Sequence, residues 1–168
     1  MRESSVYEVR DEREFEEIIT CFSKEEALSR FTDREVREEF VKKQIEFGHV
    51  FVQRLEGNPV GLLCFYCNDM LSRVAYVTAF ALKEELGIYK GITMQRLAKK
   101  LIGLGRVNKM ETVRLEVANT NSRARRLYEH LGFEYIGGND RDSSYMEMPL
   151  DKFEAVFWPG MRGAENAV

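Results

Sequence analysis

The spacing of apolar residues changes several times along the chain, and this constrains the fold more than any other feature. Residues 11–22 and 33–47 place apolar side chains three and four positions apart, which predicts amphipathic helices. Residues 113–117 alternate apolar and polar side chains, which predicts a strand. Elements that succeed one another in this way predict an α/β or α+β layered fold. The predicted strands are 6–10, 49–55, 60–67, 73–83, 113–117, 133–136 and 145–150, and the predicted helices are 11–22, 33–47, 94–105 and 124–131, with one further helical turn after residue 151.

Local signals set the ends of several of these elements. Asp11 and Asp33 stand where an N-cap is needed. Gly48 and Gly132 follow predicted helices as C-terminal stop signals. The segment Glu56-Gly57-Asn58-Pro59 separates two apolar runs and predicts a hairpin. We therefore expect the first half of the sheet to be largely antiparallel.

Length and charge exclude several classes of protein. A chain of 168 residues with 44% hydrophobic residues corresponds to one domain with a sizeable core. Its 25 basic and 28 acidic residues leave a net charge of −3, which argues against a nucleic-acid-binding protein held by phosphate contacts. The longest apolar run, 60–67, is far shorter than the roughly 20 residues of a membrane span. The first residues lack an apolar signal core, so we expect a cytoplasmic protein without membrane or nucleic-acid partners.

The cysteines and histidines give no sign of a metal or redox site. Cys64 and Cys67 form a C-x-x-C within a predicted strand, where a spacing of three points two side chains to opposite faces. A structural role is therefore predicted for both. His49 and His130 lie far apart in the sequence and have no partner at metal-ligand spacing.

A strand-to-helix passage after residue 82 is the first candidate for ligand binding. Residues 83–89 lead into Lys90-Gly91-Ile92-Thr93 and then directly into a helix. Backbone N–H groups at a glycine-containing helix N-terminus bind anions. The segment matches neither the Walker A motif nor G-x-G-x-x-G. Taken alone, it is either an anion site or an ordinary turn.

Residues 121–133 carry a more specific motif. Their sequence, NSRARRLYEHLGF, resembles the N-x-x-A-x-x-L-Y-x-x-L-G-F signature of the GNAT N-acetyltransferase superfamily. The preceding Leu115-Glu116-Val117 is also similar to that family. The loop falls where the family has R/Q-x-x-G-x-G/A, with Gly91 at the first glycine and with Ile88 and Thr93 departing from the pattern. The resemblance covers about residues 73–137.

This resemblance implies the GNAT acyl-CoA N-acyltransferase fold, a mixed and mostly antiparallel central sheet flanked by helices. It implies one domain over 1–168, with substrate-side elements in 1–50, an acetyl-CoA-binding core in 51–150 and a tail in 151–168. Acetyl-CoA is the expected co-substrate, with no metal. Main-chain groups near the family's bulged strand, here Ala81 and Leu82, are expected to stabilise the thioester oxygen. The residues expected to contact acetyl-CoA are Ala81, Leu82, Tyr89, Lys90, Gly91, Ile92, Thr93, Met94, Asn121, Arg123 and Tyr128.

The same resemblance suggests catalytic roles. An alkylammonium with a pKa near ~10.4 is mostly protonated at pH 7, so attack by an amine calls for a base. The twelve-residue spacing of Glu116 and Tyr128 is similar to that of the base and the acid in bacterial ribosomal-protein alanine acetyltransferases. The alternatives are a solvated Glu116 and a core tyrosine at 128. Asn121 is either a pantetheine ligand or a plain N-cap. Basic residues that are either phosphate ligands or solvated charges are Lys90, Arg123, Arg125 and Arg126.

The sequence therefore predicts an N-acetyltransferase that transfers acetyl from acetyl-CoA directly to a primary amine. The acceptor is a small molecule, an amino sugar being one option, or a peptide or protein N-terminus. The alternative is a non-catalytic acyl-CoA-binding or regulatory module, favoured by the departures at Ile88 and Thr93. The sequence leaves open whether the protein forms a homodimer. Weaker candidates for the acceptor side are Asn68, Asp69, Tyr76 and Thr78.

Overall fold

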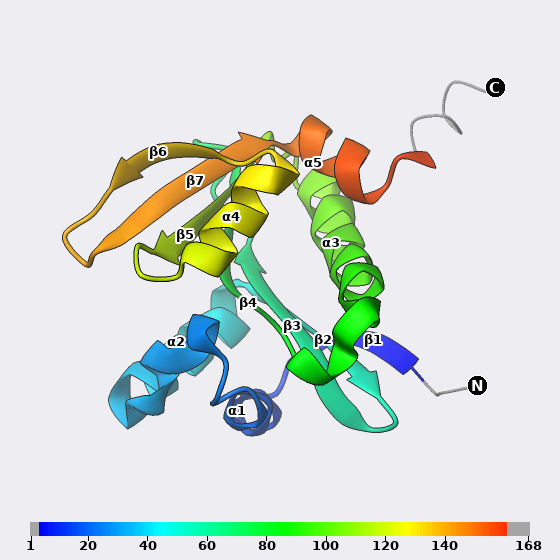
Figure 1. The fold of residues 1–168 in the computed structure, drawn as a ribbon, viewed down its shortest axis with the longest axis vertical. Helices are drawn as coiled ribbons and strands as arrows, with labels where there is room; N and C mark the ends of the chain where they lie inside the picture. The colour runs from blue at the N-terminus through cyan, green and yellow to red at the C-terminus, as the bar shows by residue number, and fades with distance from the viewer. Residues whose placement is uncertain (1–3, 161–168) are drawn as a thin grey trace.

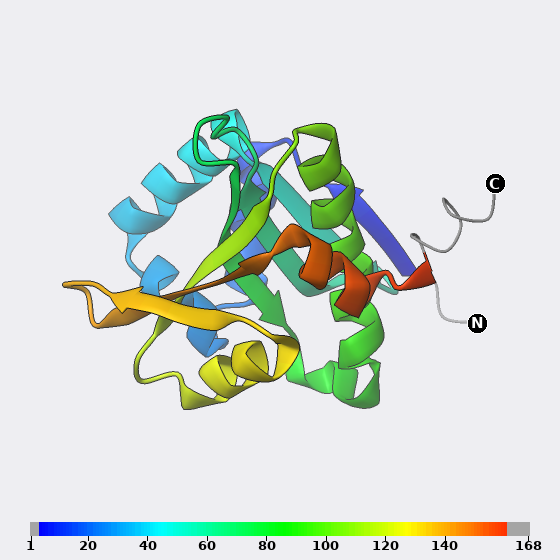
Figure 2. The same ribbon diagram turned by 90° about the horizontal axis from the view of Figure 1, so that it is seen from above.

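The computed structural model describes residues 4–160, which build one seven-stranded sheet with helices on both faces (Figure 1, Figure 2). The strands are β1 (Ser4–Glu8), β2 (His49–Leu55), β3 (Asn58–Tyr66), β4 (Val74–Leu82), β5 (Thr112–Ala118), β6 (Glu134–Gly138) and β7 (Ser143–Pro149). They lie in the order β1-β2-β3-β4-β5-β7-β6. Only the β4–β5 pair is parallel within this sheet. The predicted mixed, mostly antiparallel sheet is confirmed.

The helices begin and end largely where capping residues predict. Asp11 accepts a hydrogen bond from the Glu14 amide at 2.8 Å, and Asp33 accepts one from the Val36 amide at 3.1 Å. Gly132 ends its helix with φ 110°, a left-handed conformation that suits glycine. The helices are α1 (Glu12–Cys21), α2 (Arg34–Phe47), α3 (Lys90–Val107), α4 (Ser122–Leu131) and α5 (Leu150–Phe157), with 3₁₀ segments η1 (Glu26–Thr32) and η2 (Glu84–Tyr89).

Two hydrophobic cores lie on opposite faces of the sheet. Successive residues of β2 and β3 contribute alternately to one core and to the other, as the pleat requires. Leu62 and Cys64 pack under α1 and α2, whereas Leu63 and Phe65 pack under α3 and α5. Figures 1 and 2 show the two groups of helices on the two sides of these strands. Burial on both faces explains why residues 60–67 are continuously apolar.

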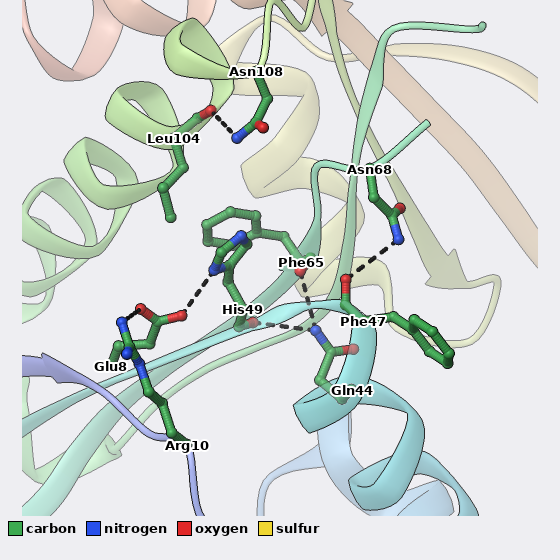
Figure 3. A network of polar contacts seen from close by, with 9 residues as sticks. All are labelled: Glu8, Arg10, Gln44, Phe47, His49, Phe65, Asn68, Leu104 and Asn108. Carbon is green, nitrogen blue, oxygen red and sulfur yellow. Dashed lines mark hydrogen bonds and ion pairs between the residues drawn. The ribbon is translucent and has the colours of Figure 1, made fainter. Parts of the chain in front are cut away.

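The C-x-x-C pair is divided between the two cores, as predicted. Cys64 lies in the core under α1 and α2, and Cys67 in the core under α3 and α5. Both are free thiols, and burial raises the pKa of Cys67 to about 12. His49 pairs instead with Glu8 at 2.8 Å (Figure 3). Across residues 4–160, no three His, Cys, Asp or Glu side chains gather as a metal site, and no helix is long and apolar enough to cross a bilayer.

Several element boundaries differ from the prediction, among them the start of α3, which begins at Lys90 instead of 94, so that the predicted loop 90–93 forms its first turn. The hairpin turn is tighter, because Glu56 and Gly57 both adopt positive φ and β3 begins at residue 58. Helix α3 does not stop near Gly105 but continues to Val107. A Cβ at Gly105 would lie 3.3 Å from Leu150, so this glycine permits close packing of α5 rather than a helix end. Helix α5 spans eight residues instead of one turn, and the rest of the predicted tail, 161–168, lies outside the described residues.

Candidate active site

The centre of the sheet opens where β4 and β5 part. Their parallel pairing runs from Val74 and Thr112 to Val77 and Leu115 and goes no further. Beyond that point β4 stays paired with β3, and β5 stays paired with β7. Figure 1 shows β5, β7 and β6 turning away from β2 and β3. The two strands therefore form a V that opens beyond Val77 and Leu115.

Two adjoining cavities fill this opening. The inner cavity, of about 310 Å³, lies between residues 77–80 of β4 and 115–118 of β5. The outer groove, of about 670 Å³, extends from there to the N-terminus of α3. The same residues line both spaces where they adjoin, and we call the two together the channel. These shared residues are Ala27, Phe80, Asn121, Ala124 and Tyr128.

Helix α4 faces this channel with an incompletely covered apolar stripe. Its apolar residues are Ala124, Leu127, Tyr128 and Leu131, and α4 buries none of them fully. Leu127, 37% exposed, lines the outer groove, and Ala124 and Tyr128 line both spaces. Ala124, Tyr128 and Leu131 also pack against the core under α3 and α5, so the stripe joins the core to an apolar cavity wall of the kind that ligand sites have. Asn121 caps this helix by accepting from the Ala124 amide at 3.1 Å and also lines both spaces.

The outer end of the groove is suited to an anion. No side chain caps the N-terminus of α3, where the helix dipole favours a phosphate. The Lys90 amide donates to the Gly87 carbonyl of η2, so a phosphate would bind to amides beyond it. A Cβ at Gly91 would meet nothing within 4 Å, which leaves the approach open. Lys90 and Arg123 both lie here, at 2.9 and 3.1 Å from the carboxylate of Glu84. The hydrogen bond from Lys90 in particular lowers the pKa of Glu84. Sequence reasoning did not anticipate this carboxylate between the two cations.

The other predicted loop residues are placed differently from one another. Tyr89 and Ile92 are about half exposed and do not line either cavity, and Ile88 is 90% exposed. Thr93 is buried, and its Cγ2 would lie 2.8 Å from a Cβ at Gly61 of β3. Its side chain therefore points to the sheet, into space that Gly61 leaves free. The threonine that replaces the family's glycine at position 93 therefore does not block the groove. Predicted contact residues that do line the groove are Ala81, Leu82, Lys90, Gly91, Met94, Asn121, Arg123 and Tyr128.

Glu116 lies in the inner cavity within a polar network. Its carboxylate accepts hydrogen bonds from Asn139 Nδ2 at 2.9 Å and from the Tyr76 hydroxyl at 3.2 Å, and Arg141 lies 3.8 Å away. Burial acts to raise the pKa of Glu116, but these hydrogen bonds and the charge of Arg141 outweigh it and lower the pKa. Glu116 is therefore a partly buried, ionised carboxylate at neutral pH, and the solvated alternative is wrong because its side chain is only 14% exposed.

Tyr128 lies at the junction of the channel. Its ring packs edge-on against Phe133, with centroids 5.7 Å apart, so it also contributes to packing. Among residues 4–160 its hydroxyl has no hydrogen-bond partner. Burial raises its pKa to about 12. The hydroxyl thus stays protonated at neutral pH and can donate a hydrogen bond to a ligand in the channel.

The bulge of β4 lies at Thr78, not near Ala81 and Leu82 as expected. The register passes from Cys64–Ala79 to Phe65–Val77, which leaves Thr78 without a strand partner. Ala81 and Leu82 remain in the ladder, opposite residues 62 and 61. The irregular backbone at Thr78 therefore lies in the wall of the inner cavity.

Gln44 of α2 fixes this bulge from beneath the sheet. Its amide nitrogen donates to the carbonyls of His49 and Phe65, each at 3.1 Å (Figure 3). Its amide oxygen accepts from the Thr78 hydroxyl at 2.8 Å. The side chain is fully buried, so these bonds have no competition from water. No role for Gln44 was predicted from the sequence.

We expect Gln44→Leu to destabilise the fold by about 1–3 kcal/mol, because buried acceptors and a hydroxyl lose their partner. Thermal unfolding measures this loss. Gln53→Leu is the matched control, since Gln53 is also buried but its Oε1 has no hydrogen-bond partner within the described part of the chain. Removing that unsatisfied group should cost less than Gln44→Leu. Equal melting temperatures for wild type and Gln44→Leu would contradict the role given to Gln44.

Other cavity residues come from segments to which the sequence gave no site role. Arg30 of η1 reaches the wall of the inner cavity and donates to the Thr78 carbonyl at 2.5 Å. Arg141, from the β6–β7 turn, also lines that cavity. Of the weaker candidates, Tyr76 donates to Glu116, and Thr78 donates to Gln44 and lines the inner cavity. Asn68 and Asp69 do not line either cavity; Asn68 donates to the Phe47 carbonyl, and Asp69 accepts from the amides of its own turn.

Comparisons with known proteins agree with this arrangement. A sequence model of the acetyltransferase (GNAT) family matches residues 12–133. No curated protein matches the chain. An acetyltransferase structure from Streptococcus agalactiae is 13% identical at a TM-score of 0.70, covering 87% of this chain and 98% of that one. The structure of yncA from Salmonella typhimurium with acetyl-CoA is 17% identical at 0.61, covering 88% and 94%. Spermidine N-acetyltransferase SpeG from Vibrio cholerae, as a point mutant, is 18% identical at 0.62, covering 89% and 95%.

The similar structures, all at low sequence identity, show a shared fold. The family match shows in addition that the sequence is related to the family. It spans more than half of the chain and includes α3, β5 and α4, which surround the channel. The acyltransferase chemistry expected from the motif at 121–133 is supported by the family match. The chain belongs to the acetyltransferase (GNAT) family and is an acyltransferase.

Proposed function

We propose that this protein transfers an acetyl group from acetyl-CoA directly to a primary amine in a ternary complex. The observation that carries the proposal is the channel. It connects an uncapped helix N-terminus with adjacent cations, at Lys90 and Arg123, to an ionised Glu116. Tyr128 lies between the two ends. A donor can therefore enter from one end and an acceptor from the other.

The outer groove fits acetyl-CoA by the chemistry of its lining. The amides at the start of α3, with Lys90 and Arg123, would hold the pyrophosphate. Leu82, Met94 and Leu127 provide an apolar wall for the pantetheine arm. Because Glu84 pairs with both cations, phosphate binding has to exchange one anionic partner for another. When bound, acetyl-CoA supplies the thioester that is attacked.

Three groups of the inner cavity would assist the transfer. Glu116 would bind the incoming ammonium and pass the ammonium proton on to water. A carboxylate with a lowered pKa does not retain a proton well at neutral pH. The backbone N–H of Thr78, at the break in the strand register, would donate to the developing negative charge on the carbonyl oxygen, while Arg30 holds the Thr78 carbonyl. Tyr128 would protonate the departing thiolate, whose pKa is near ~8.5 in a simple thiol. This assignment uses each group in the protonation state that its surroundings favour.

The acceptor is a small-molecule amine or the N-terminus of a peptide. The related SpeG structure is that of a spermidine N-acetyltransferase, an enzyme acting on a small amine. The inner cavity of about 310 Å³ has the size of a small-molecule site. A non-catalytic acyl-CoA-binding module is the second candidate, motivated by the departures at Ile88 and Thr93. It is the weaker one, because Thr93 faces the sheet and leaves the groove open.

Acetyl-CoA turnover with a panel of primary amines, followed by thiol release, tests the proposal. Acetylation of at least one amine above the rate without acceptor is the expected result. Tight binding of acetyl-CoA in calorimetry, with no turnover of any amine, would instead establish the binding module. Absence of both binding and turnover would overturn both candidates.

We expect Gly91→Glu to weaken CoA binding at least tenfold, or about 1.4 kcal/mol. The change adds a negative charge where the pyrophosphate would lie, in a position where the side chain meets no obstacle. Calorimetric titration with CoA measures the effect. Gly103→Glu is the matched control: Gly103 is on the same helix, a Cβ there also meets nothing within 4 Å, and it lies outside the groove. Equal affinities for wild type and Gly91→Glu would show that CoA does not bind at this helix start.

A further inference from the structure

The inner cavity holds an excess of positive charge. Its charged lining consists of one carboxylate, Glu116, and two guanidinium groups, Arg30 and Arg141. They come from three separate elements: β5, η1 and the turn between β6 and β7. An acceptor amine that approaches Glu116 therefore also approaches two cations. A purely cationic acceptor would be repelled by them.

Arg30 is positioned but not neutralised. It donates one hydrogen bond to the Thr78 carbonyl, and its guanidinium lies 4.6 Å from the Phe31 ring centroid. Among the side chains that the structure describes, no carboxylate forms an ion pair with it. Partial removal from water lowers its pKa, and the charge of Glu116 opposes this effect. A guanidinium stays protonated at neutral pH and has five donors, so Arg30 retains donors for another anion.

Arg141 lies on the open side of the same cavity. Its guanidinium is 3.8 Å from a Glu116 oxygen, and its side chain is 75% exposed. Glu116 already accepts hydrogen bonds from Asn139 and Tyr76. An exposed ion pair at this distance is weak and exchanges readily for another partner. Arg141 can thus turn to an anionic group of a bound acceptor while Glu116 keeps its neutral donors.

We propose that the acceptor is a small zwitterion, a primary amine that carries a carboxylate or phosphate a few bonds away. This inference rests on the proposed function and specifies its substrate class. The amine would lie at Glu116 and the anion at Arg30 and Arg141, which matches each charge of the acceptor with an opposite charge of the cavity. Guanidinium groups bind carboxylate and phosphate through paired hydrogen bonds, so both anions fit the same site.

Matched pairs of acceptors test the proposal with acetyl-CoA and the full chain. One set comprises L-amino acids and their primary amides, and the other comprises glucosamine 6-phosphate and glucosamine. Within each pair only the anion differs substantially. The amine of an amino-acid amide is less basic and more often unprotonated at pH 7, so chemistry alone favours the amide. We expect at least one anionic member to have a kcat/KM ten times or more that of its neutral partner. The set that shows this preference identifies the anion.

Variants of the two arginines connect the preference to the site. Arg30→Gln and Arg141→Gln should each reduce the ratio of anionic to neutral kcat/KM severalfold, and the double variant should bring it close to one. Arg13→Gln, which removes an exposed arginine of α1 paired only with Glu17, should keep the wild-type ratio. If Arg30→Gln does not fold, the exposed Arg141 still supports the comparison.

The outcomes separate this inference from the function on which it rests. Turnover in which the neutral member of every pair equals or exceeds the anionic one would overturn the zwitterion and leave acetyl transfer standing. A preference that survives in the double variant would also overturn it. Failure of every amine, charged or neutral, would overturn the proposed function itself, and the substrate class with it.

Discussion

Glu116→Gln is expected to lower turnover by about 10²- to 10³-fold at neutral pH. Positioned bases contribute about 10²–10⁴-fold, and the lowered pKa of Glu116 places it in the lower part of that range. The substitution keeps the shape of the side chain and its contact with Asn139 but removes the negative charge that holds an ammonium. Initial rates of thiol release at saturating acetyl-CoA measure the loss.

The dependence of this loss on pH identifies its cause. The pKa of Glu116 lies below its usual value, so the carboxylate is ionised throughout the neutral and alkaline range and protonates only as the pH falls below that of an ordinary glutamate. The acceptor amine, by contrast, loses its proton as the pH rises. The deficit of Glu116→Gln should therefore shrink at high pH. A variant with wild-type rates at every pH would remove Glu116 from the mechanism.

A second carboxylate provides the control for this experiment. Glu147 lies on the neighbouring strand β7, is partly exposed, and pairs with Arg114 at 2.9 Å. It does not line the channel. Glu147→Gln should change turnover only slightly, so a large effect of both variants would indicate a general loss of charge or stability.

Elements governed by short-range signals could be predicted from the sequence. Asp11, Asp33 and Gly132 act within one turn of their own helices, and the alternation of residues 113–117 directly reflects a strand with two different faces. Segment η1 could not be predicted in this way. It has no regular apolar period, and it is held by tertiary contacts, such as the Phe31 ring stacked on Phe40 of the following helix α2, with ring centroids 4.2 Å apart.

The same distinction separates the site residues. Asn121 and Tyr128 lie in one contiguous motif, and Glu116 directly precedes it, so a resemblance could locate all three. Arg30 reaches the cavity, and Gln44 reaches the bulge in the cavity wall, only because α1, η1 and α2 fold against the sheet. No local pattern distinguishes them from the many other polar residues of those segments.

The position of the bulge was also beyond sequence reasoning. Residues 74–82 form a run of strand-forming residues without a glycine or proline to mark an irregularity. The irregularity depends on Gln44, which binds the Phe65 carbonyl on one strand and the Thr78 hydroxyl on the other. A long-range contact therefore sets the geometry of the cavity wall, and only the folded structure shows it.

Tyr128→Phe is expected to reduce turnover by about 10²-fold while acetyl-CoA affinity stays close to that of wild type. A proton donor used only in the transition state lowers the rate without weakening ground-state binding. Phenylalanine keeps the ring that packs against Phe133, and the hydroxyl it removes has no partner among residues 4–160, so thermal stability should hardly change. Tyr135→Phe, at an exposed tyrosine of β6, is the control. Steady-state rates and calorimetry together decide the point, because a Tyr128→Phe enzyme with full turnover would reduce the tyrosine to a packing residue.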